Sequence, residues 1–356
     1  MAMREALNDA GLTPADIDGV LTNQPLNDPK RCHAVDLAGA LGIQASYLTD
    51  LAAGGATPVM MLQHAVMAIQ AGLCETVICV HARKSKTGYL EPKRGDVRDG
   101  WDEFEVPFGL HGALPQHAVC AQRHMYEYGT TSVQLGEIAL ACRYHASLNP
   151  AATMREPLTL EDHQSSRWIV EPLHLLDCCL VSDGGGAFIV TNGDRAVDFP
   201  KKPVFVRGMG QFHPHGTLME AQTLTTIGAK RSSEKAYQLA ELRPSDIDFA
   251  EIYDCFTITV LMTLEGYGFC PIGEGGNWVQ GGRIRLAGDL PVNTHGGLLS
   301  QAHIEGMLHI TEAVKQLRGG EVEPARQVRN AHFGIVSGHG CRLSTHSTVI
   351  LSDLAS

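Results

Sequence analysis

Two adjacent glycines, Gly54 and Gly55, stand where a short apolar segment meets a long apolar helix in the stretch TDLAAGGATPVMML. Thr57 suits the N-cap of that helix and Pro58 suits its first position, so a buried helix is predicted over residues 57–72. The N-terminal end of a helix presents free backbone N–H groups and a partial positive charge. Glycines at such an end either approach an anion or a developing oxyanion, or simply let a strand turn sharply into a helix.

The ten cysteines and seventeen histidines contain no spacing typical of a metal site. Neither CxxC nor HExxH occurs, whereas zinc sites usually show such pairs. We therefore expect no metal, no resident cofactor and reduced, buried thiols. The glycine runs Gly184–Gly186 and Gly281–Gly282 do not follow a strand and open a helix as a phosphate-binding loop must, so both are predicted to be turns.

Composition limits the classes of partner. Of the 356 residues, 44% are hydrophobic and 19% are charged, which is ordinary for a globular protein. The formal net charge of -11 argues against nucleic acid or an anionic membrane as partner, because both require a basic patch. No apolar run reaches the roughly 18 residues of a membrane span, and the first residues do not resemble a signal peptide. These features predict a cytoplasmic protein.

The pattern of apolar residues predicts the elements that hold these groups. The first half is expected to contain a helix at 2–11, a strand at 18–22, a helix at 33–41, a strand at 46–51, the helix 57–72 and a strand at 76–82. An irregular excursion, 84–172, holds two helical pieces near 115–128 and 133–146. The predicted domains are therefore 1–83 together with 173–200, the excursion 84–172, and a second half, 201–356, that repeats the α/β plan.

Two segments, 6–20 and 236–250, read ALNDAGLTPADIDGV and AYQLAELRPSDIDFA and share seven residues in one ungapped register. Each predicts a helix, a turn with proline and a strand, which indicates a duplicated unit; chance recurrence of a short pattern is the alternative. A strand, 203–212, precedes the second copy and has no counterpart before Met1. We therefore expect the first strand to be missing, through a truncated or wrongly assigned start or a sheet that is natively one strand short.

Two long motifs in the second half resemble the thiolase superfamily, specifically its sterol-carrier-protein and lipid-transfer type. They are EIYDCFTITVLMTLEGYGFCPIGEGGNW and VNTHGGLLSQAHIEGMLHITEAV. The segments RHMYEYG, HASLNPAA and LTLEDHQSSRWIVEPLHLLDCC resemble the aldolase-like branch, which acts on steroid side-chain acyl-CoA. The similarity extends over almost the whole chain. It implies a thiolase-like fold, with two duplicated βαβαβ-type halves packed as α/β/α/β/α layers and an inserted loop domain.

The resemblance also gives Gly55 a meaning. Thiolases carry a nucleophilic cysteine at the start of this buried helix, in the pattern C-A-[ST]-G, and here G-A-T-P places Gly55 at that position. Because glycine offers no nucleophile, no acyl-enzyme can form there. The second family cysteine, in C-x-GGG, is missing as well. Cys255 and Cys341 remain the candidate thiols if the chain is a thiolase with a relocated cysteine.

Two residues match catalytic positions of the family. His303 in SQAHIEG matches the histidine that donates to the thioester oxygen, although Ile304 replaces the usual proline. Histidine suits proton transfer near neutral pH; the alternative is a histidine tied to a backbone carbonyl. Tyr253 stands where thiolases have Asn or His and where the aldolase branch has Tyr. It could be an acid or base despite a reference pKa of about 10, or a core tyrosine. Asp254 is expected to cap the helix that follows.

The NTHGG loop, with Asn293, His295, Gly296 and Gly297, matches the loop that shapes the floor of the family's pocket. His295 could donate to a bound oxygen, but a structural role is the better expectation. His339 in SGHG lies where the family has glycines that line the oxyanion hole, which makes it a further candidate acid or base.

These residues favour enolate chemistry on an acyl-CoA, with coenzyme A present as part of the substrate. A retro-aldol cleavage needs a base for the hydroxyl group and a hole for the enolate oxygen, but no acyl-enzyme. We expect carbon–carbon cleavage or formation, with Tyr253 and His303 as base and acid. The backbone near Gly54 and Gly55, together with His303, is expected to hold the oxyanion.

Three alternatives remain at this stage: an acetyl-CoA acyltransferase with a non-standard cysteine, a non-catalytic acyl-CoA- or lipid-binding subunit, and an inactive fragment. The resemblance further implies a small OB-fold partner protein. It also implies a homodimer that pairs through the strand 46–51, since an unpaired strand at that position is a liability for a monomer.

Overall fold

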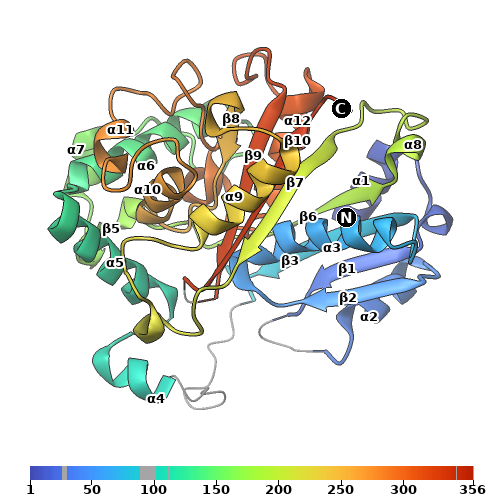
Figure 1. Ribbon diagram of the computed structural model, residues 1–356, viewed down its shortest axis with the longest axis horizontal. Coiled ribbons are helices and arrows are strands. Elements are labelled where there is room, and N and C mark those ends of the chain that lie inside the picture. Colours follow the sequence, from blue (N-terminus) through green and yellow to red (C-terminus); the bar gives the residue numbers. More distant parts are fainter. Residues whose placement is uncertain (26–29, 89–101, 111, 342, 356) are drawn as a thin grey trace.

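Two four-stranded sheets form the centre of the computed structural model, which describes the chain apart from residues 26–29, 89–101, 111, 342 and 356 (Figure 1). The first sheet has the order β2-β1-β3-β6 and consists of β1 (Gly19–Asn23), β2 (Tyr47–Leu51), β3 (Thr76–Lys84) and β6 (Asp183–Thr191). The second has the order β7-β10-β9-β8 and consists of β7 (Phe205–Phe212), β8 (Phe249–Glu251), β9 (Phe333–Gly340) and β10 (Thr345–Ser352).

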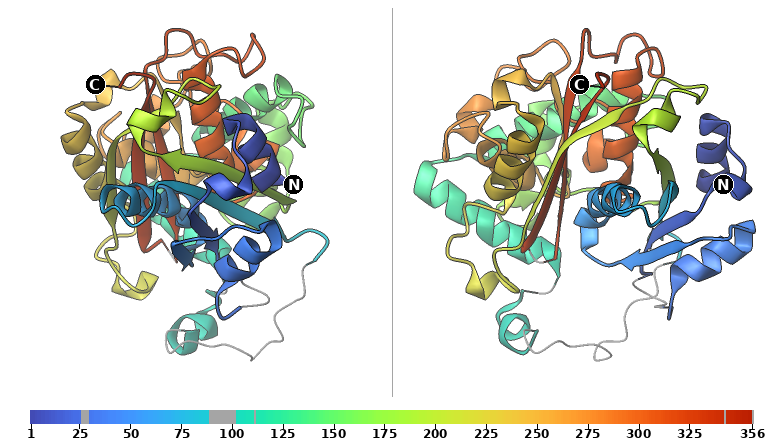
Figure 2. Two further views of the ribbon diagram at one scale, coloured as in Figure 1. Left: turned by 90° about the vertical axis from the view of Figure 1, so that its right-hand side faces the viewer. Right: turned by 45° about the vertical axis from the view of Figure 1, so that its right-hand side comes forward.

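Two helices lie between the sheets. Helix α3 (Thr57–Gln70) contacts strands of both sheets, and so does α12 (Met307–Arg318). Helices α1 (Ala2–Ala10) and α2 (His33–Leu41) cover the outer face of the first sheet, while α9 (Ala229–Ala240) and, behind it, α10 (Thr257–Gly266) cover the second (Figure 2). The predicted α/β/α/β/α layering is confirmed.

The excursion packs on the second half although it is inserted in the first. Helices α5 (Ala113–Tyr128) and α6 (Ser132–Ser147) both contact α10. Short elements complete the description: α4 (Asp102–Glu105), α7 (Leu160–Ser165), α8 (Gly193–Ala196), α11 (Gly275–Trp278), and the hairpin β4 (Trp168–Val170) and β5 (Leu173–His174). Among the described residues no helix is long and apolar enough to cross a membrane.

The duplication predicted from the sequence is visible in matching hydrogen bonds. The carboxylate of Asp18 accepts the backbone N–H groups of Glu75 and Thr76 and so fixes the start of β3. Asp248, the corresponding residue of the second copy, accepts the N–H groups of His332 and Phe333 at the start of β9. The last Asp of each DID motif thus has the same role in both halves: it joins β1 to β3 and β8 to β9.

Both sheets have four strands, but their edge strands β2 and β7 do not correspond to each other. In the second sheet β7 pairs with β10 on the side away from β9. In the first sheet, none of the described residues form a strand at the corresponding edge of β6. The missing first strand of the first half stays a prediction.

The run Gly184–Gly186 lies inside strand β6, so the prediction of a turn is wrong there. A Cβ atom at Gly184 would lie 2.6 Å from Cδ1 of Ile304, and one at Gly186 would lie 2.4 Å from Cγ of Met307. Real Cβ atoms do not approach other atoms so closely. The glycines therefore let the segment that carries His303 pack directly on the strand.

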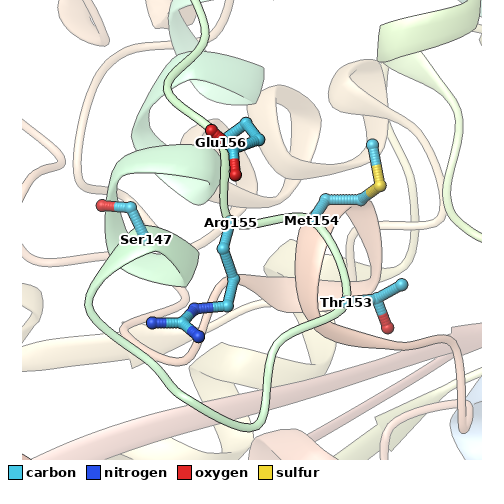
Figure 3. Close-up of a pocket in the computed structure, with 5 residues that line it drawn as sticks. All are labelled: Ser147, Thr153, Met154, Arg155 and Glu156. Atoms are coloured by element: carbon cyan, nitrogen blue, oxygen red, sulfur yellow. The ribbon is translucent and has the colours of Figure 1, made fainter.

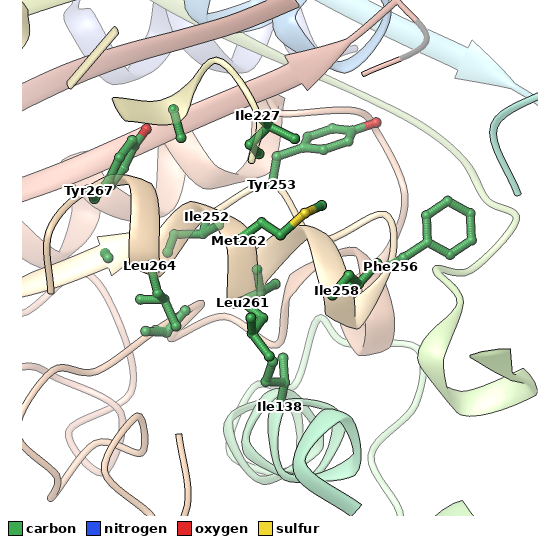
Figure 4. Packing of buried hydrophobic residues seen from close by; sticks show 14 of the residues in the cluster. Ile138, Ile227, Ile252, Tyr253, Phe256, Ile258, Leu261, Met262, Leu264 and Tyr267 are labelled. Carbon is green, nitrogen blue, oxygen red and sulfur yellow. The ribbon is translucent and has the colours of Figure 1, made fainter. Parts of the chain in front are cut away.

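A large apolar cluster surrounds α10, which is buried on all sides (Figure 4). Ile258, Leu261 and Met262 of this helix belong to the same cluster as Ile138 of α6. Tyr253, just before the helix, is also part of it. The ring of Tyr253 is therefore held rigidly, because protein interiors are packed as densely as organic crystals.

Candidate active site

The phenol ring of Tyr253 occupies the space in front of helix α3. A short 3₁₀ turn, Gly54–Ala56, leads into the helix, and Gly55 is buried. A Cβ atom at Gly55 would lie 2.0 Å from Cζ and 2.3 Å from the hydroxyl oxygen of Tyr253. Any side chain at this position would therefore overlap the tyrosine. The glycine does more than remove a nucleophile, because it makes room for the hydroxyl that takes its place.

The structure brings Tyr253 and His303 together. The hydroxyl oxygen of Tyr253 lies 3.2 Å from Nε2 of His303. Burial lowers the pKa of His303 to about 4, and the charge of Arg83 acts in the same direction. Burial raises the pKa of Tyr253 well above its usual value. Both groups are therefore uncharged near neutral pH and share one hydrogen bond.

A cysteine that the sequence did not single out completes this contact. The sulfur of Cys179 lies 3.4 Å from Nδ1 of His303, on the ring edge away from Tyr253. Burial raises the pKa of the Cys179 thiol well above its usual value. A neutral thiol is a weak nucleophile but can still form a hydrogen bond to the imidazole.

Three more charged or polar groups near His303 were also missed. His81 and Arg83 follow Val77 and Cys79 at alternate positions of β3, and those two apolar side chains face α3. Because side chains alternate along a strand, the same face continues through His81 and Arg83 toward the site. This alternation is a signal that sequence reasoning could have used. Glu305, two residues after His303, pairs with Arg83.

Asp254 does not cap the helix that follows it, so that expectation is wrong. Helix α10 has Phe256 at its N-cap position, without a side-chain hydrogen bond. Asp254 instead accepts the N–H groups of Leu298 and Leu299, at 2.8 Å and 3.2 Å. A Cβ atom at Gly297 would lie 2.0 Å from the Asp254 carboxylate. Asp254 thus fixes the π-helical turn that leads to His303.

The other residues of the NTHGG loop are held inside the protein. The side chain of Asn293 bonds to both the N–H and the carbonyl of Ile252, at 2.6 Å and 2.9 Å. Nδ1 of His295 lies 2.8 Å from Oε2 of Glu251, and both side chains are buried. Gly296 has a φ of 105° and lies against Ala146. Their part in a pocket floor stays a prediction.

His339 of strand β9 also lies near Tyr253. The two ring centroids are 6.5 Å apart, and His339 is also 5.7 Å from the ring of His117 and 5.8 Å from that of His346. Burial lowers its pKa well below the usual value. Neither of its ring nitrogens has a hydrogen-bond partner among the described residues. A buried imidazole in this state is available to a polar atom of a ligand.

Neither candidate thiol occupies the place of Gly55. The backbone nitrogen of Cys341 lies 3.4 Å from where a Cβ atom at Gly54 would be, and a reactive role for this cysteine stays a prediction. Cys255 is buried, with its sulfur 3.5 Å from Nε2 of His117, and burial raises its pKa to about 12. Cys341 is exposed at the end of β9. Because the thiolate is the reactive form, Cys255 is inert at neutral pH. No group of three or more metal-binding side chains occurs in the part of the chain that the structure describes.

A cavity of about 470 Å³ lies on the excursion and is lined by Ser147, Thr153, Met154, Arg155 and Glu156 (Figure 3). None of the residues predicted for the site line it. The loop that forms it is tied to the turn before His303, because the N–H of Met154 donates to the carbonyl of Ser300. The cavity is thus linked to the segment that leads to His303, but Tyr253 and His303 are not among its lining residues.

Known proteins are similar to this chain in sequence and in fold. Residues 210–353 match the family model of thiolase C-terminal domain-like proteins. A steroid side-chain-cleaving aldolase of Thermomonospora curvata is 38% identical over 345 residues, which cover 92% of this chain and 87% of the relative. The 17-hydroxy-3-oxo-4-pregnene-20-carboxyl-CoA lyase of Mycobacterium tuberculosis is 36% identical, with coverages of 95% and 90%.

Solved structures agree with this similarity. The Ltp2-ChsH2(DUF35) aldolase superposes with a TM-score of 0.89 at 36% identity, and the match covers 98% of this chain and 90% of that one. A monomeric SCP2-thiolase like protein type 1 from Mycobacterium smegmatis superposes with a TM-score of 0.78 at 19% identity, covering 100% and 72%. The second likeness concerns the fold alone.

Proposed function

The chain belongs to the thiolase superfamily, in its aldolase-like branch, and we propose that the Tyr253–His303 pair performs the proton transfers of a carbon–carbon lyase acting on an acyl-CoA. One observation carries this proposal. The hydroxyl of Tyr253 fills the space of the missing nucleophile and lies 3.2 Å from Nε2 of His303. A site built in this way offers proton transfer in the place where thiolases form an acyl-enzyme.

The proposed reaction is a retro-aldol cleavage of a β-hydroxyacyl-CoA. Tyr253 accepts the proton of the substrate hydroxyl while its own proton moves to Nε2 of His303. The oxygen forms a carbonyl, the adjacent carbon–carbon bond breaks, and its electron pair becomes the enolate of the thioester. The enolate carbon then takes up one proton from the pair, so the proton balance closes. The reverse sequence forms the bond.

Two features of the site support this assignment. The N-terminal end of α3, preceded by Gly54 and Gly55, is a place for the negative charge of the enolate oxygen. His303, once it has taken the proton of Tyr253 on Nε2, adds a positive charge beside it. A buried tyrosine does not ionise alone, since desolvation penalises the phenolate. Transfer through the hydrogen bond to His303 avoids an isolated phenolate.

The relatives suggest the class of substrate and the assembly. Two of them are named for steroid side-chain cleavage and for a steroid-derived carboxyl-CoA, so we place a bulky polycyclic or branched β-hydroxyacyl-CoA in the site. Coenzyme A takes part only as a portion of the substrate. The solved relative has two components in its name, and we propose a small OB-fold partner for this chain as well, and a cytoplasmic location.

We further propose a homodimer that pairs through β2. This strand forms one edge of the first sheet, and all five of its residues are half-buried. An edge strand of this kind offers unpaired N–H and C=O groups to a second copy. Sedimentation of the purified protein, compared with a variant that has proline in place of Thr49, tests this point.

The central experiment is a mass-spectrometric turnover assay with a panel of β-hydroxyacyl-CoA and β-ketoacyl-CoA thioesters, with and without the partner. Cleavage of a hydroxyacyl-CoA is expected, without a covalent acyl adduct on the protein. Tyr253→Phe and His303→Gln are each expected to lower kcat by about 100-fold or more, the usual size of acid–base effects. Tyr126→Phe is the matched control, because Tyr126 is 79% exposed.

Other outcomes would redirect the proposal. An acyl adduct, or cleavage of ketoacyl-CoA that needs free coenzyme A, would identify a thiolase with a relocated cysteine. Tight binding of every thioester without turnover would identify a carrier. Wild-type rates in both site variants would remove Tyr253 and His303 from the reaction.

A further inference from the structure

Glu305 is a buried carboxylate that the proposed reaction does not use. Its side chain is 6% exposed, and Oε1 lies 2.6 Å from Nη1 of Arg83 in strand β3. Oε2 lies 3.6 Å from Nε2 of His81. Burial raises the pKa of Glu305, while the charge of Arg83 opposes this. A carboxylate is rarely buried unless an interaction of this kind compensates it.

The backbone of Glu305 is in an unfavourable conformation. Its φ is 48°, in the left-handed region that favours glycine. A residue with a side chain costs roughly 1 kcal/mol or more there. Glycine or asparagine would be easier to accommodate, so stability does not explain a glutamate at this position. Strained residues of this kind are concentrated at functional sites.

Each residue of the segment from His303 to Gly306 makes a contact of its own with the surrounding structure. The N–H of His303 donates to Oγ of Ser182 at 3.0 Å. Ile304 packs against Gly184 of β6, and a Cβ atom at Gly306 would lie 3.2 Å from the carbonyl oxygen of Gly55. Glu305 supplies the fourth anchor, to β3. Of the four, it is the one made by a pair of charges.

The segment from His303 to Gly306 is surrounded by the titratable groups that lie near the Tyr253–His303 pair. The titratable groups facing Tyr253, His303 and Glu305 are His81 and Arg83 from β3, Cys179, Asp254 and Cys255 from the loops, His309 from α12 and His339 from β9. Burial is the main cause that raises the pKa of Tyr253, and the charge of Glu305 acts in the same direction. Arg83 opposes it.

We propose that Glu305 is a positioning residue for the Tyr253–His303 pair: through its ion pair with Arg83 it ties the His303 segment to β3 and keeps Nε2 of His303 within hydrogen-bond distance of the Tyr253 hydroxyl. This inference rests on the proposed function. It assigns a role to the strained backbone, to the buried charge and to Arg83 at once. Small displacements of a proton-transfer group lower the reaction rate strongly. A rigid anchor for His303 can therefore be favoured even though the backbone of Glu305 is strained.

The test compares Glu305→Gly, Glu305→Asp, Arg83→Gln and the double variant Arg83→Gln/Glu305→Gly. Glycine suits the backbone but removes the carboxylate, so Glu305→Gly is expected to fold with an unchanged or higher Tm. Its kcat is expected to fall by about tenfold or more with KM within about twofold, as when an interaction with the transition state is lost. Glu305→Asp should recover part of the rate.

The ion pair gives a second criterion. Arg83→Gln is expected to lower kcat as much as Glu305→Gly, and the double variant no further, because the two residues act as one unit. The ¹⁵N signals of the His303 ring should shift in all of these variants, a readout that needs no turnover. Glu75→Gln, which breaks the exposed ion pair with Arg195, is the matched control and should change nothing.

Several results would overturn the inference. A Glu305→Gly protein with wild-type kcat would do so, as would fully additive losses in the double variant. A fall in both Tm and kcat with unchanged His303 signals would mean a structural role only. If Glu305→Gly does not fold, Arg83→Gln decides: a folded protein with wild-type kcat contradicts the proposal, and a tenfold loss with shifted signals supports it. Failure of the proposed function is separate, since only that failure leaves Tyr253→Phe and His303→Gln active.

Discussion

At the scale of single residues, Gly55 shows how one missing side chain changes the chemistry of a fold. The space that a side chain of residue 55 would fill is occupied by the ring of Tyr253. We predict that Gly55→Ala displaces this ring, abolishes cleavage and lowers the free energy of unfolding by about 1–3 kcal/mol, the usual cost of overpacking. Thermal unfolding and the turnover assay measure both effects.

A matched control and a rescue make this prediction specific. Gly39 lies in α2, and a Cβ atom added there would have nothing within 4 Å, so Gly39→Ala should be neutral or stabilise by up to about 1 kcal/mol. The double variant Gly55→Ala/Tyr253→Asn should regain stability but not activity. A stable and active Gly55→Ala protein would contradict the assignment of this space to the tyrosine.

The sequence located part of the site and missed the rest for a physical reason. Motifs identified Gly55, Tyr253 and His303, because each occupies a fixed place in a long local pattern. Cys179 and Glu305 carry no local pattern, and their meaning comes from contacts across more than a hundred residues of chain. Asp254 was misread because helix N-caps are local, whereas its real partners are the N–H groups of a distant loop.

At the scale of elements, β6 depends on its glycines. A Cβ atom at Gly186 would lie 2.4 Å from Cγ of Met307. We predict that Gly186→Ala pushes α12 away from the strand, lowers Tm by several degrees and reduces kcat, because His303 moves with the start of α12. Thermal unfolding and the turnover assay measure both. Met307→Ala in the same protein removes the clash and should restore most of the lost stability.

The neighbouring glycine offers an internal comparison. Gly185 faces the other side of the strand, where a Cβ atom would lie 3.1 Å from Cβ of Ala82. Gly185→Ala therefore needs a smaller adjustment and should leave the activity closer to wild type. Equal effects at the two positions would mean that the strand itself, and not its contact with Met307, requires glycine.

The elements themselves were predicted well because they follow simple periodicities. The predicted helix 33–41 coincides with α2, and the predicted strands 18–22 and 46–51 differ from β1 and β2 by no more than one residue at either end. The run Gly184–Gly186 was misread because three glycines locally suggest a turn, while close approach of another segment is invisible in one stretch of sequence.

At the scale of the whole molecule, the excursion 84–172 packs against a half of the protein to which it does not belong in sequence. It is inserted in the first half, yet α6 packs on α10 of the second half and on the turn Gly297–Gln301 that leads to His303. The excursion therefore supports the turn that leads to His303. Layer order followed from the alternation of strands and helices, but this docking depends on contacts between distant segments.

The protein also contains several buried histidine side chains that are uncharged at neutral pH. Burial lowers the pKa to about 3 or about 4 for six of them: His81, His117, His145, His295, His303 and His346. Burial also lowers the pKa of His339 well below its usual value. In the unfolded chain each would take up a proton near pH 6.5. The unfolded state thus binds more protons than the folded state between pH 6.5 and about 4, and stability must fall as the pH falls through that window.

The size of this effect makes acid unfolding measurable. Each such histidine costs on the order of 1 kcal/mol by pH 5.5, so together they cost several kcal/mol, a large part of the roughly 5–15 kcal/mol of a typical domain. Glu251, whose pKa burial raises to about 7, gains a proton over the same range and offsets about one histidine. We predict cooperative unfolding between about pH 6 and 5, with activity lost in the same transition.

Urea unfolding at a series of pH values from 8 to 5 measures this linkage. His145→Asn removes one buried imidazole that lies outside the Tyr253–His303 pair and should flatten the dependence of stability on pH. His213→Asn, which changes an exposed histidine, should leave the slope unchanged. Constant stability down to pH 5 would mean that the interior admits protons without unfolding. In that case the buried histidines keep pKa values near the ordinary one, and a loss of activity in the folded protein at acid pH would report protonation of His303 itself.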